Sequence, residues 1–372
     1  MNASTDDARV QARVLDAADD RRAGADDPVP DDDAIDRAGS GTAHSSRRSF
    51  LARACTGLAL AATNLPDVAE AGPVRLRSGL AWASGCFSDP DRFVSLYRRR
   101  PLDILNVYLA KNSWQDIAGA GGIGRHVTGR SETIMISYPL FPENYNPARQ
   151  GAGLWRQAAS GEFDRYHASS ASNLGRYKRK FVFRIGWEWN NNAMPWACHD
   201  VRYAESYIRY FQRVVNLLRD RNPDCLIDWS SDKEGRTNAD LRRWYPGRHY
   251  VDFIGCNRYD FWPVLGSPGA WSANLNKVRF GGPVGMNAWL DYARSSGKLL
   301  SVGEWGLTTG KREGGGDNPF FIERMLRFFH DNARYIGYEC IFNENTRSFR
   351  HDFSSNPKSG AMYRRLMSPG AL

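Results

Sequence analysis

The chain has 372 residues, of which 42% are hydrophobic and 12% aromatic, and its formal net charge is +9. This length and apolar content can bury a full core, in either two medium domains or one α/β barrel. A basic balance alone does not separate nucleic-acid, membrane or acidic polysaccharide partners from simple solubility. Because the basic residues are scattered and no nucleic-acid-binding motif accompanies them, we expect no nucleic-acid partner.

The N-terminal segment has the composition of an export leader. Residues 1–40 are acidic and poor in aromatics, which predicts a disordered leader. Residues 41–71 resemble a twin-arginine signal peptide, because Arg47 and Arg48 precede the mildly apolar residues 52–65 and a small-residue cleavage pattern. The other interpretation is a helix that packs on the domain. We expect cleavage at the end of this segment and a periplasmic or secreted protein, without stable membrane insertion because the apolar stretch is too short.

Eight short apolar runs follow, rich in Ile, Val, Leu and aromatics, as is typical of parallel strands covered on both faces. They span residues 78–82, 102–109, 132–138, 180–187, 225–230, 250–257, 298–304 and 336–343. Amphipathic stretches between them predict helices, the clearest at 203–221, 286–296 and 319–332. Asp317 is the expected N-cap of the last helix, with Pro319 in its first turn.

The alternation of strands and helices predicts parallel βαβ units. Eight such units in about 300 residues match an α/β fold of the (β/α)8 TIM barrel type, here over residues 72–372. The competing architecture is a doubly wound open sheet, which normally has a glycine-rich phosphate turn after its first strand. Residues 84–86 do not form such a turn. We therefore predict a single barrel domain, and we expect a monomer.

The cysteines and histidines do not have the spacing of a metal or redox site. Five cysteines remain after the signal, none with CxxC spacing, and an odd number leaves at least one free thiol. A single disulfide between Cys86 and Cys198 is the pairing we expect, because both should lie on loops. His199, His249 and Asp200 show no metal-ligand spacing, so we expect no metal and no cofactor.

Two glutamates end predicted strands among aromatic residues. Glu188 follows the fourth run, between Trp187 and Trp189, and Glu304 ends the seventh, beside Trp305. A carboxylate at the end of a buried strand is costly to keep ionised unless it is paired, so its placement needs a reason. Glycosidic hydrolysis supplies one, because it uses one carboxyl group as acid and a second as nucleophile or base. The alternative is a buried ion pair between Glu188 and Arg184, four residues earlier.

At these residues the chain resembles the clan A glycoside hydrolases, and within them glycoside hydrolase family 26, best known for endo-β-mannanases. The likeness rests on Arg184, Glu188, Asn190 and Trp196 around the fourth strand, and on Glu304 at the end of the seventh. It implies a barrel in which the fourth strand supplies the acid/base and the seventh the nucleophile. It therefore implies a retaining enzyme, with Glu188 as acid/base and Glu304 as nucleophile.

The likeness continues on the sixth strand and departs beside the acid/base. Residues 251–259 resemble the family's sixth-strand element, which ends in a tyrosine that hydrogen-bonds the nucleophile, and this implies that role for Tyr259. The family usually has His, and most of the clan Asn, directly before the acid/base, where this chain has Trp187. The departure indicates a divergent member, whose substrate can be a polymer other than mannan.

We expect ten residues around the two glutamates to bind substrate, because flat aromatic faces stack on sugars and polar groups orient them. They are Arg184, Trp187, Trp189, Asn190, Trp196, Trp229, Asn257, Tyr259, Trp262 and Trp305. Each tryptophan can equally be an ordinary packing residue. The loop carboxylates Asp232 and Glu234 extend the cleft or are simply solvated.

The predicted function is a secreted retaining endo-β-glycanase that cleaves mannan or another polysaccharide. Two alternatives remain, namely a transglycosylase or exopolysaccharide-processing glycosidase with the same two glutamates, and a non-catalytic glycan-binding barrel. The last is disfavoured because loss of catalysis removes the reason to keep both carboxylates. A serine hydrolase is weaker still, because the chain has no G-x-S-x-G elbow.

Overall fold

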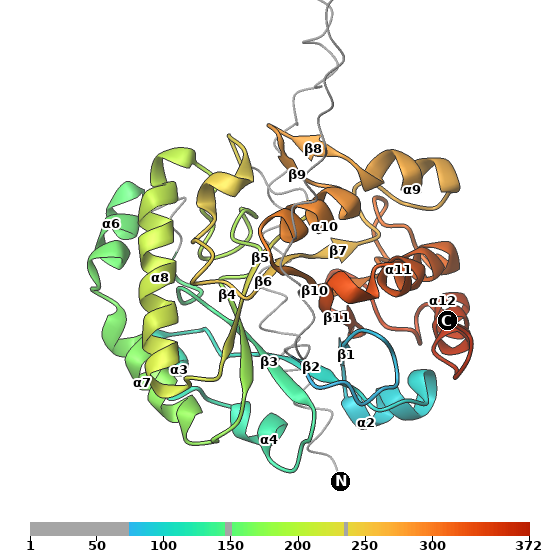
Figure 1. Cartoon of the computed structure of the whole chain (residues 1–372), viewed down its shortest axis with the longest axis horizontal. Coiled ribbons are helices and arrows are strands. Elements are labelled where there is room, and N and C mark those ends of the chain that lie inside the picture. Colours follow the sequence, from blue (N-terminus) through green and yellow to red (C-terminus); the bar gives the residue numbers. More distant parts are fainter. Residues whose placement is uncertain (1–73, 146–150, 234–236) are drawn as a thin grey trace, which may run out of the picture.

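The computed structural model describes residues 74–145, 151–233 and 237–372 (Figure 1). Its centre is a closed barrel of eight parallel strands, each paired with the next, and the last pairs with the first. The strands are β1 (Ser84–Phe87), β2 (Ile104–Tyr108), β3 (Thr133–Tyr138), β4 (Phe181–Ile185), β5 (Leu226–Ser231), β6 (Phe253–Cys256), β10 (Leu299–Gly306) and β11 (Ile336–Phe342). The predicted TIM barrel is confirmed. The predicted leader and signal peptide lie outside the described residues.

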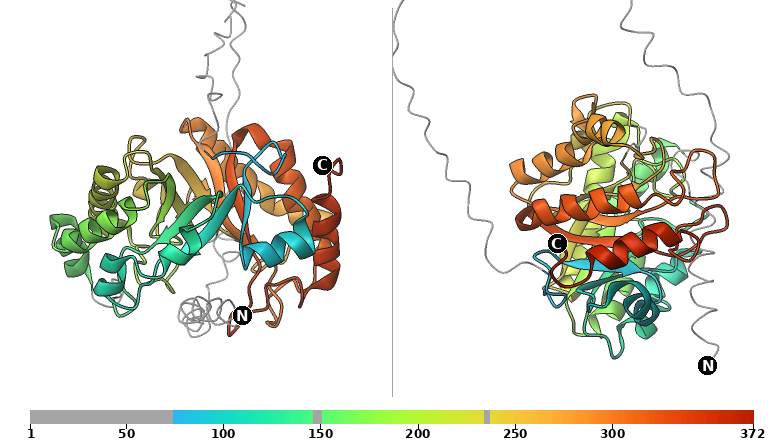
Figure 2. Two further views of the ribbon diagram at one scale, coloured as in Figure 1. Left: turned by 90° about the horizontal axis from the view of Figure 1, so that it is seen from below. Right: turned by 90° about the vertical axis from the view of Figure 1, so that its right-hand side faces the viewer.

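Helices surround the strands and cover their outer faces (Figure 2). The longest is α8, whose buried stripe of Tyr207, Tyr210, Val214 and Leu218 packs onto the barrel as its amphipathic sequence predicts. In chain order the helices are α2 (Pro90–Phe93), η2 (Val94–Arg98), α3 (Trp114–Gly119), α4 (Ile123–Val127), α6 (Ala152–Ser160), α7 (Asp164–Gly175), η3 (Val201–Tyr203), α8 (Ala204–Arg221), η4 (Leu241–Trp244), α9 (Pro268–Leu275), α10 (Met286–Ser295), α11 (Pro319–Asp331), η5 (Ala333–Tyr335) and α12 (Pro357–Leu366).

The segment between β6 and α10 contains three short strands. β7 (Arg258–Tyr259) follows β6 after a single residue, Asn257, and pairs with the end of β10. β8 (Val278–Arg279) and β9 (Gly282–Pro283) form a small antiparallel hairpin after α9. The pairing of β7 with β10 brings Asn257 and Tyr259 to the mouth of the barrel, beside Glu304.

The first predicted strand was placed too early. Residues 78–82 bend and do not join the sheet, and the first strand begins at Ser84. Leu80 and Trp82 are nevertheless buried in the core. The Asp103 carboxylate accepts bonds from the Ser78 backbone N–H and hydroxyl, which holds the bend. Burial of alternate residues therefore does not distinguish this segment from a strand.

The predicted N-cap of α11 was wrong by one residue. Asn318 caps the helix, because its side-chain oxygen accepts a bond from the Phe321 backbone N–H. The Asp317 carboxylate instead accepts bonds from the backbone N–H groups of Lys358 and Ser359, at the start of α12. Asp317 thus stabilises the neighbouring helix, where its negative charge is also favourable.

The predicted disulfide between Cys86 and Cys198 is absent. Both residues are free and buried, as are Cys225, Cys256 and Cys340. Cys86 lies within β1 and not on a loop, so its side chain belongs to the core. Burial raises the pKa of the Cys198 thiol to about 12, which leaves it uncharged and unreactive at neutral pH.

The barrel interior changes from apolar to polar along the strands. Ile104, Met135 and Val182 belong to an apolar cluster formed by residues of several strands. Two residues further along the same strands come Asn106, Ser137 and Arg184, which face the same side because side chains alternate along a strand. The strand period therefore places Arg184 inside the barrel, directly below its mouth.

We expect residues 72–372 to fold without the N-terminal segment, because the closed barrel and its helices are complete within the described residues. Expression of this fragment should give a soluble protein with a single cooperative thermal transition. A fragment that aggregates while the full chain folds would contradict the proposed boundary.

Among the described residues, no helix combines the length and apolar character that a membrane crossing requires.

Candidate active site

Glu188 and Glu304 lie at the same end of the barrel. Glu304 is the sixth residue of β10 and is 5% exposed, and Glu188, just beyond β4, is 1% exposed. Glu188 has a φ of 52°, in the left-handed region that non-glycine residues seldom adopt. Its backbone N–H donates to the Ser230 carbonyl at 3.0 Å and holds this conformation. Such local strain is concentrated at functional positions of proteins.

Glu304 is held as an anion by three neighbours. Arg184 Nη1 donates to Glu304 Oε1 at 2.6 Å, and the Tyr259 hydroxyl donates to Glu304 Oε2 at 2.8 Å. Burial alone would raise the pKa of Glu304, but the Arg184 guanidinium and the hydroxyls of Tyr108 and Tyr259 lower it below its usual value. The hydrogen bond predicted between Tyr259 and Glu304 is present.

Asn257 connects the two glutamates. Its side-chain oxygen accepts from Arg184 Nη2 at 2.7 Å, and its Nδ2 donates to Glu188 Oε1 at 2.7 Å. A continuous chain of short hydrogen bonds therefore runs from Glu188 through Asn257 and Arg184 to Glu304. Arg184 forms a buried ion pair with Glu304.

Below this chain, a second polar group supports Arg184. Asp228 accepts bonds from the hydroxyls of Ser301 and Tyr338, and all three side chains are fully buried. Burial raises the pKa of Asp228 to about 6, although these hydroxyls and Arg184 act in the opposite direction. Gly303 leaves room for the guanidinium, because a Cβ at this position would lie 2.8 Å from Arg184 Nε.

Comparison with solved structures relates this barrel to carbohydrate-active enzymes. It is similar to "GH26C" from Muricauda sp. MAR_2010_75, with a TM-score of 0.52 and 16% identity over 79% of this chain and 87% of that one. A GH26 β-mannanase from Bacteroides ovatus gives a TM-score of 0.52 and 14% identity over 78% of this chain and 86% of that one. An endo-β-1,4-mannanase double mutant from Cellulomonas fimi gives a TM-score of 0.51 and 16% identity over 77% of this chain and 67% of that one.

The chain has the fold of the family 26 glycoside hydrolases. No protein-family model matches the chain, and no curated protein matches its sequence. The resemblance seen in the sequence is thus confirmed as a likeness of fold. At 14–16% identity it assigns no substrate.

The tryptophans expected to bind sugar differ greatly in exposure. Eleven of the twelve tryptophans of the chain are buried, and only Trp262, in the loop after β7, is open to solvent, with 57% exposed. The Lys233 ammonium donates to the Trp262 carbonyl and fixes this loop. Trp262 is therefore the one indole whose face is available for stacking on a ligand.

Three of the expected tryptophans pack outside the barrel. Trp189 stacks on Trp229 with ring centroids 5.5 Å apart, and its other neighbours include Tyr207 of α8. Trp305 points toward α11 and donates to Glu339 at 2.5 Å. Trp189, Trp229 and Trp305 are fully buried in this packing. The structure gives these indoles a packing role and offers no face of theirs to a sugar.

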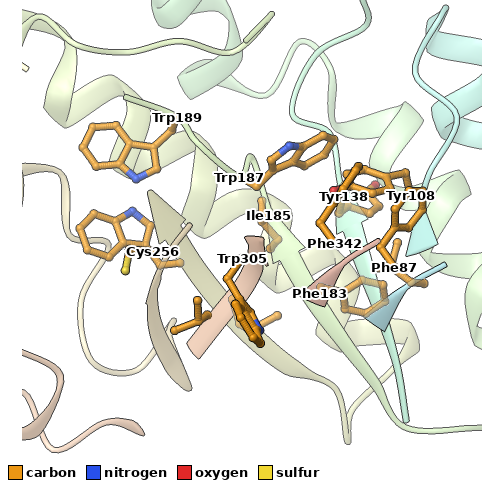
Figure 3. Close-up of a cluster of buried hydrophobic side chains, with 14 of the residues drawn as sticks. Phe87, Tyr108, Tyr138, Phe183, Ile185, Trp187, Trp189, Cys256, Trp305 and Phe342 are labelled. Carbon is orange, nitrogen blue, oxygen red and sulfur yellow. The ribbon is translucent and has the colours of Figure 1, made fainter. Parts of the chain in front are cut away.

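Trp187 and Trp196 form a buried pair beside the glutamates. Their rings are 4.4 Å apart, and Trp196 Nε1 donates to the Trp187 carbonyl at 2.7 Å. Trp187 also contacts the Tyr108 ring at 5.3 Å and the Arg184 guanidinium at 6.0 Å. Figure 3 shows Trp187 turned toward Tyr108 and Trp189 turned away from it. Trp187 thus helps form the wall of the site, and Trp196 supports it.

Asn190 fastens two loops together and does not face the glutamates' hydrogen-bond chain. Its side-chain oxygen accepts from the Asp232 backbone N–H at 2.7 Å, and its Nδ2 donates to the Asp232 carbonyl at 3.0 Å. The amide is therefore fully used in joining the segments after β4 and β5.

The sequence reasoning missed Asn191 and Tyr108. Asn191 Nδ2 lies 3.2 Å from Glu188 Oε2 and 3.4 Å from the Asp232 carboxylate. The position of Tyr108 near the end of the predicted strand 102–109 was a usable signal, because polar groups at that end reach the mouth of a barrel. Asn191 gave no such signal, since it lies in a turn that the sequence pattern does not specify.

The loop carboxylates Asp232 and Glu234 were the remaining candidates from the sequence. Asp232 lies near Asn191, as described above, and Glu234 lies outside the described residues. Within the described ranges, no group of three or more His, Cys, Asp or Glu side chains is arranged to hold a metal ion.

We expect Tyr259→Phe to lower kcat roughly 10- to 100-fold with little change in KM. The hydroxyl that donates to Glu304 would be lost, and a hydrogen bond to a charged group contributes about 1.5–3 kcal/mol. Steady-state kinetics on the best substrate would measure kcat and KM separately. Tyr210→Phe is the control, because it removes a buried hydroxyl on α8 that donates to the Leu140 carbonyl. Wild-type kinetics for Tyr259→Phe would refute its role at Glu304.

Proposed function

We propose that the protein is a retaining glycoside hydrolase that cleaves a polysaccharide, with Glu304 as nucleophile and Glu188 as acid/base. In this mechanism the nucleophile attacks the anomeric carbon, and the acid protonates the departing oxygen. Water then releases the covalent intermediate, with the former acid acting as base.

The observation that supports this proposal is the unequal environment of two buried glutamates joined by one hydrogen-bond chain. Glu304 is paired with Arg184 and its pKa is lowered, as an ionised nucleophile requires. Glu188 is 1% exposed and accepts hydrogen bonds from the neutral amides of Asn257 and Asn191. That environment suits a carboxyl group that must bind and release a proton.

The surroundings support a carbohydrate ligand. Trp262 presents an open indole at the same end of the barrel, and Trp187 with Tyr108 forms an aromatic wall beside Arg184. Mannan is the first substrate to test, because similar solved structures are described as mannanases. We further propose that the protein is exported by its twin-arginine segment and acts as a monomer.

The test is hydrolysis of a panel of mannans, glucans, xylans and bacterial exopolysaccharides, with products followed by ¹H NMR. We expect cleavage of at least one polymer and a first-formed product with the anomeric configuration of the substrate. An inverted product would contradict the nucleophilic role of Glu304. Absence of cleavage across the panel, with the protein folded, would contradict the proposed activity.

A further inference from the structure

Asp260 lies at the base of the loop that carries Trp262. It directly follows β7, its backbone N–H donates to the Gly306 carbonyl at the end of β10 at 3.0 Å, and its side chain is fully buried. Asp260 Oδ1 accepts from the Leu265 backbone N–H at 2.7 Å. Because this bond joins the two ends of the loop, the exposed residues 262–264 form its tip.

A second hydrogen bond ties the Asp260 carboxylate to the start of α11. Asp260 Oδ2 accepts from Asn318 Nδ2 at 2.7 Å. The orientation of the Asn318 amide is fixed, because its oxygen caps α11 by accepting from the Phe321 backbone N–H at 3.2 Å. Both oxygens of Asp260 therefore face donors. A carboxylate satisfies both, whereas an asparagine at position 260 would turn its own NH2 group against one of them.

The glycine-rich segment before α11 closes on the same residue. The Gly315 backbone N–H donates to the Asp260 carbonyl at 2.9 Å, and Gly314 forms an isolated antiparallel bridge with Phe261. A Cβ at position 315 would overlap the Asp260 carboxylate, so glycine is needed for this close approach. Asp260 thus joins the Trp262 loop to the segment that follows β10.

We propose that Asp260 is a positioning residue that holds the Trp262 indole in place as a stacking surface for a sugar ring of the substrate. This inference rests on the proposed function, since it requires a carbohydrate at this end of the barrel. A loop that is ordered before binding loses less conformational entropy when the ligand arrives. Loss of Asp260 should therefore weaken substrate binding and leave the chemical step at Glu188 and Glu304 unchanged.

The first test is a double-mutant cycle in steady-state kinetics on the polysaccharide that the wild type hydrolyses. We expect Trp262→Ala to raise KM about tenfold and Asp260→Asn about fivefold, with kcat within about twofold of wild type in both. The double variant should keep the KM of Trp262→Ala, because Asp260 acts through an indole that is then missing. A lower kcat with unchanged KM in Asp260→Asn, or effects on KM that multiply in the double variant, would overturn the proposal.

A second variant breaks the same contact from the other side. Asn318→Asp keeps an N-cap oxygen for α11 but places an acceptor against Asp260 Oδ2, so KM should rise as in Asp260→Asn. The matched control is Asp317→Asn, whose carboxylate accepts bonds at the start of α12, and its kinetics should match wild type. A rise in KM in this control as large as in Asp260→Asn would show a general loosening around α11 and contradict the specific role of Asp260.

The last test does not depend on activity. Hydrogen–deuterium exchange of the full chain, followed by mass spectrometry, should be at least tenfold faster for residues 261–265 in Asp260→Asn, because the Leu265 N–H loses its anionic acceptor. Unchanged exchange overturns the proposal. If the wild type cleaves no polymer, the proposed function fails, and affinity electrophoresis in gels that contain the same polymers tests the stacking role separately. Equal retardation of the wild type and Asp260→Asn would then refute that role.

Discussion

Glu304→Gln should abolish hydrolysis, with kcat lower by on the order of 10⁴-fold or more, because an amide cannot attack the anomeric carbon. Activated aryl glycosides should give no rescue, since a better leaving group does not replace a missing nucleophile. Initial rates on the polysaccharide and on a 2,4-dinitrophenyl glycoside would measure both effects.

This substitution also leaves the buried Arg184 guanidinium without its anionic partner, and breaking such a pair costs about 3–5 kcal/mol of stability. A thermal melt must therefore accompany the kinetics. Glu304→Asp is the matched control, because it keeps the negative charge but withdraws the carboxylate by one methylene. It should melt close to wild type and remain nearly inactive. A fully active Glu304→Asp would show that Glu304 is not the nucleophile.

Glu188→Ala should lower kcat on polysaccharide by roughly 10²- to 10⁴-fold, the usual contribution of a general acid. On a dinitrophenyl glycoside the first step should survive and the glycosyl-enzyme should accumulate, because the base for its hydrolysis is missing. Azide, which needs no base, should restore turnover and give a glycosyl azide of retained configuration. Mass spectrometry of the trapped enzyme and NMR of the azide product would measure this.

Asp232→Ala is the control for this rescue, because Asp232 is a loop carboxylate connected to Glu188 through Asn191. Azide should have no effect on this variant. Rescue of Asp232→Ala but not of Glu188→Ala would transfer the acid/base role to Asp232.

The barrel and the main residues of its mouth were predictable from local patterns. Parallel strands buried on both faces produce apolar runs, and seven of the eight runs overlap the strands of the barrel. The first run was misplaced because Leu80 and Trp82 are buried by a bend that Asp103 holds, and no local pattern records that contact. Glu188 and Glu304 were predictable because polar residues at strand ends face the mouth, whereas the role of Tyr259 was implied by the family resemblance of residues 251–259.

The roles of the tryptophans and amides were not predictable to the same degree. An indole beside a glutamate has the same sequence signature whether it faces the barrel axis or a helix, and Trp189 and Trp305 face helices. Asn190 and Asn257 likewise differ only in their partners, the Asp232 backbone and the Glu188 carboxyl group. Those partners come from other strands, so only the closed barrel distinguishes these roles.

Asp228 links the folding of the barrel to proton binding. Its pKa of about 6 in the fold lies above the ordinary value of 3.8, so between these pH values the folded chain holds a proton there that the unfolded chain releases. The stability from this group is complete below the unfolded pKa and is lost as pH rises through about 6. At neutral pH the fold must keep an anion at its centre, below Arg184. The polar layer beneath Glu188 and Glu304 therefore makes mild acid more favourable to folding, and neutral pH less so.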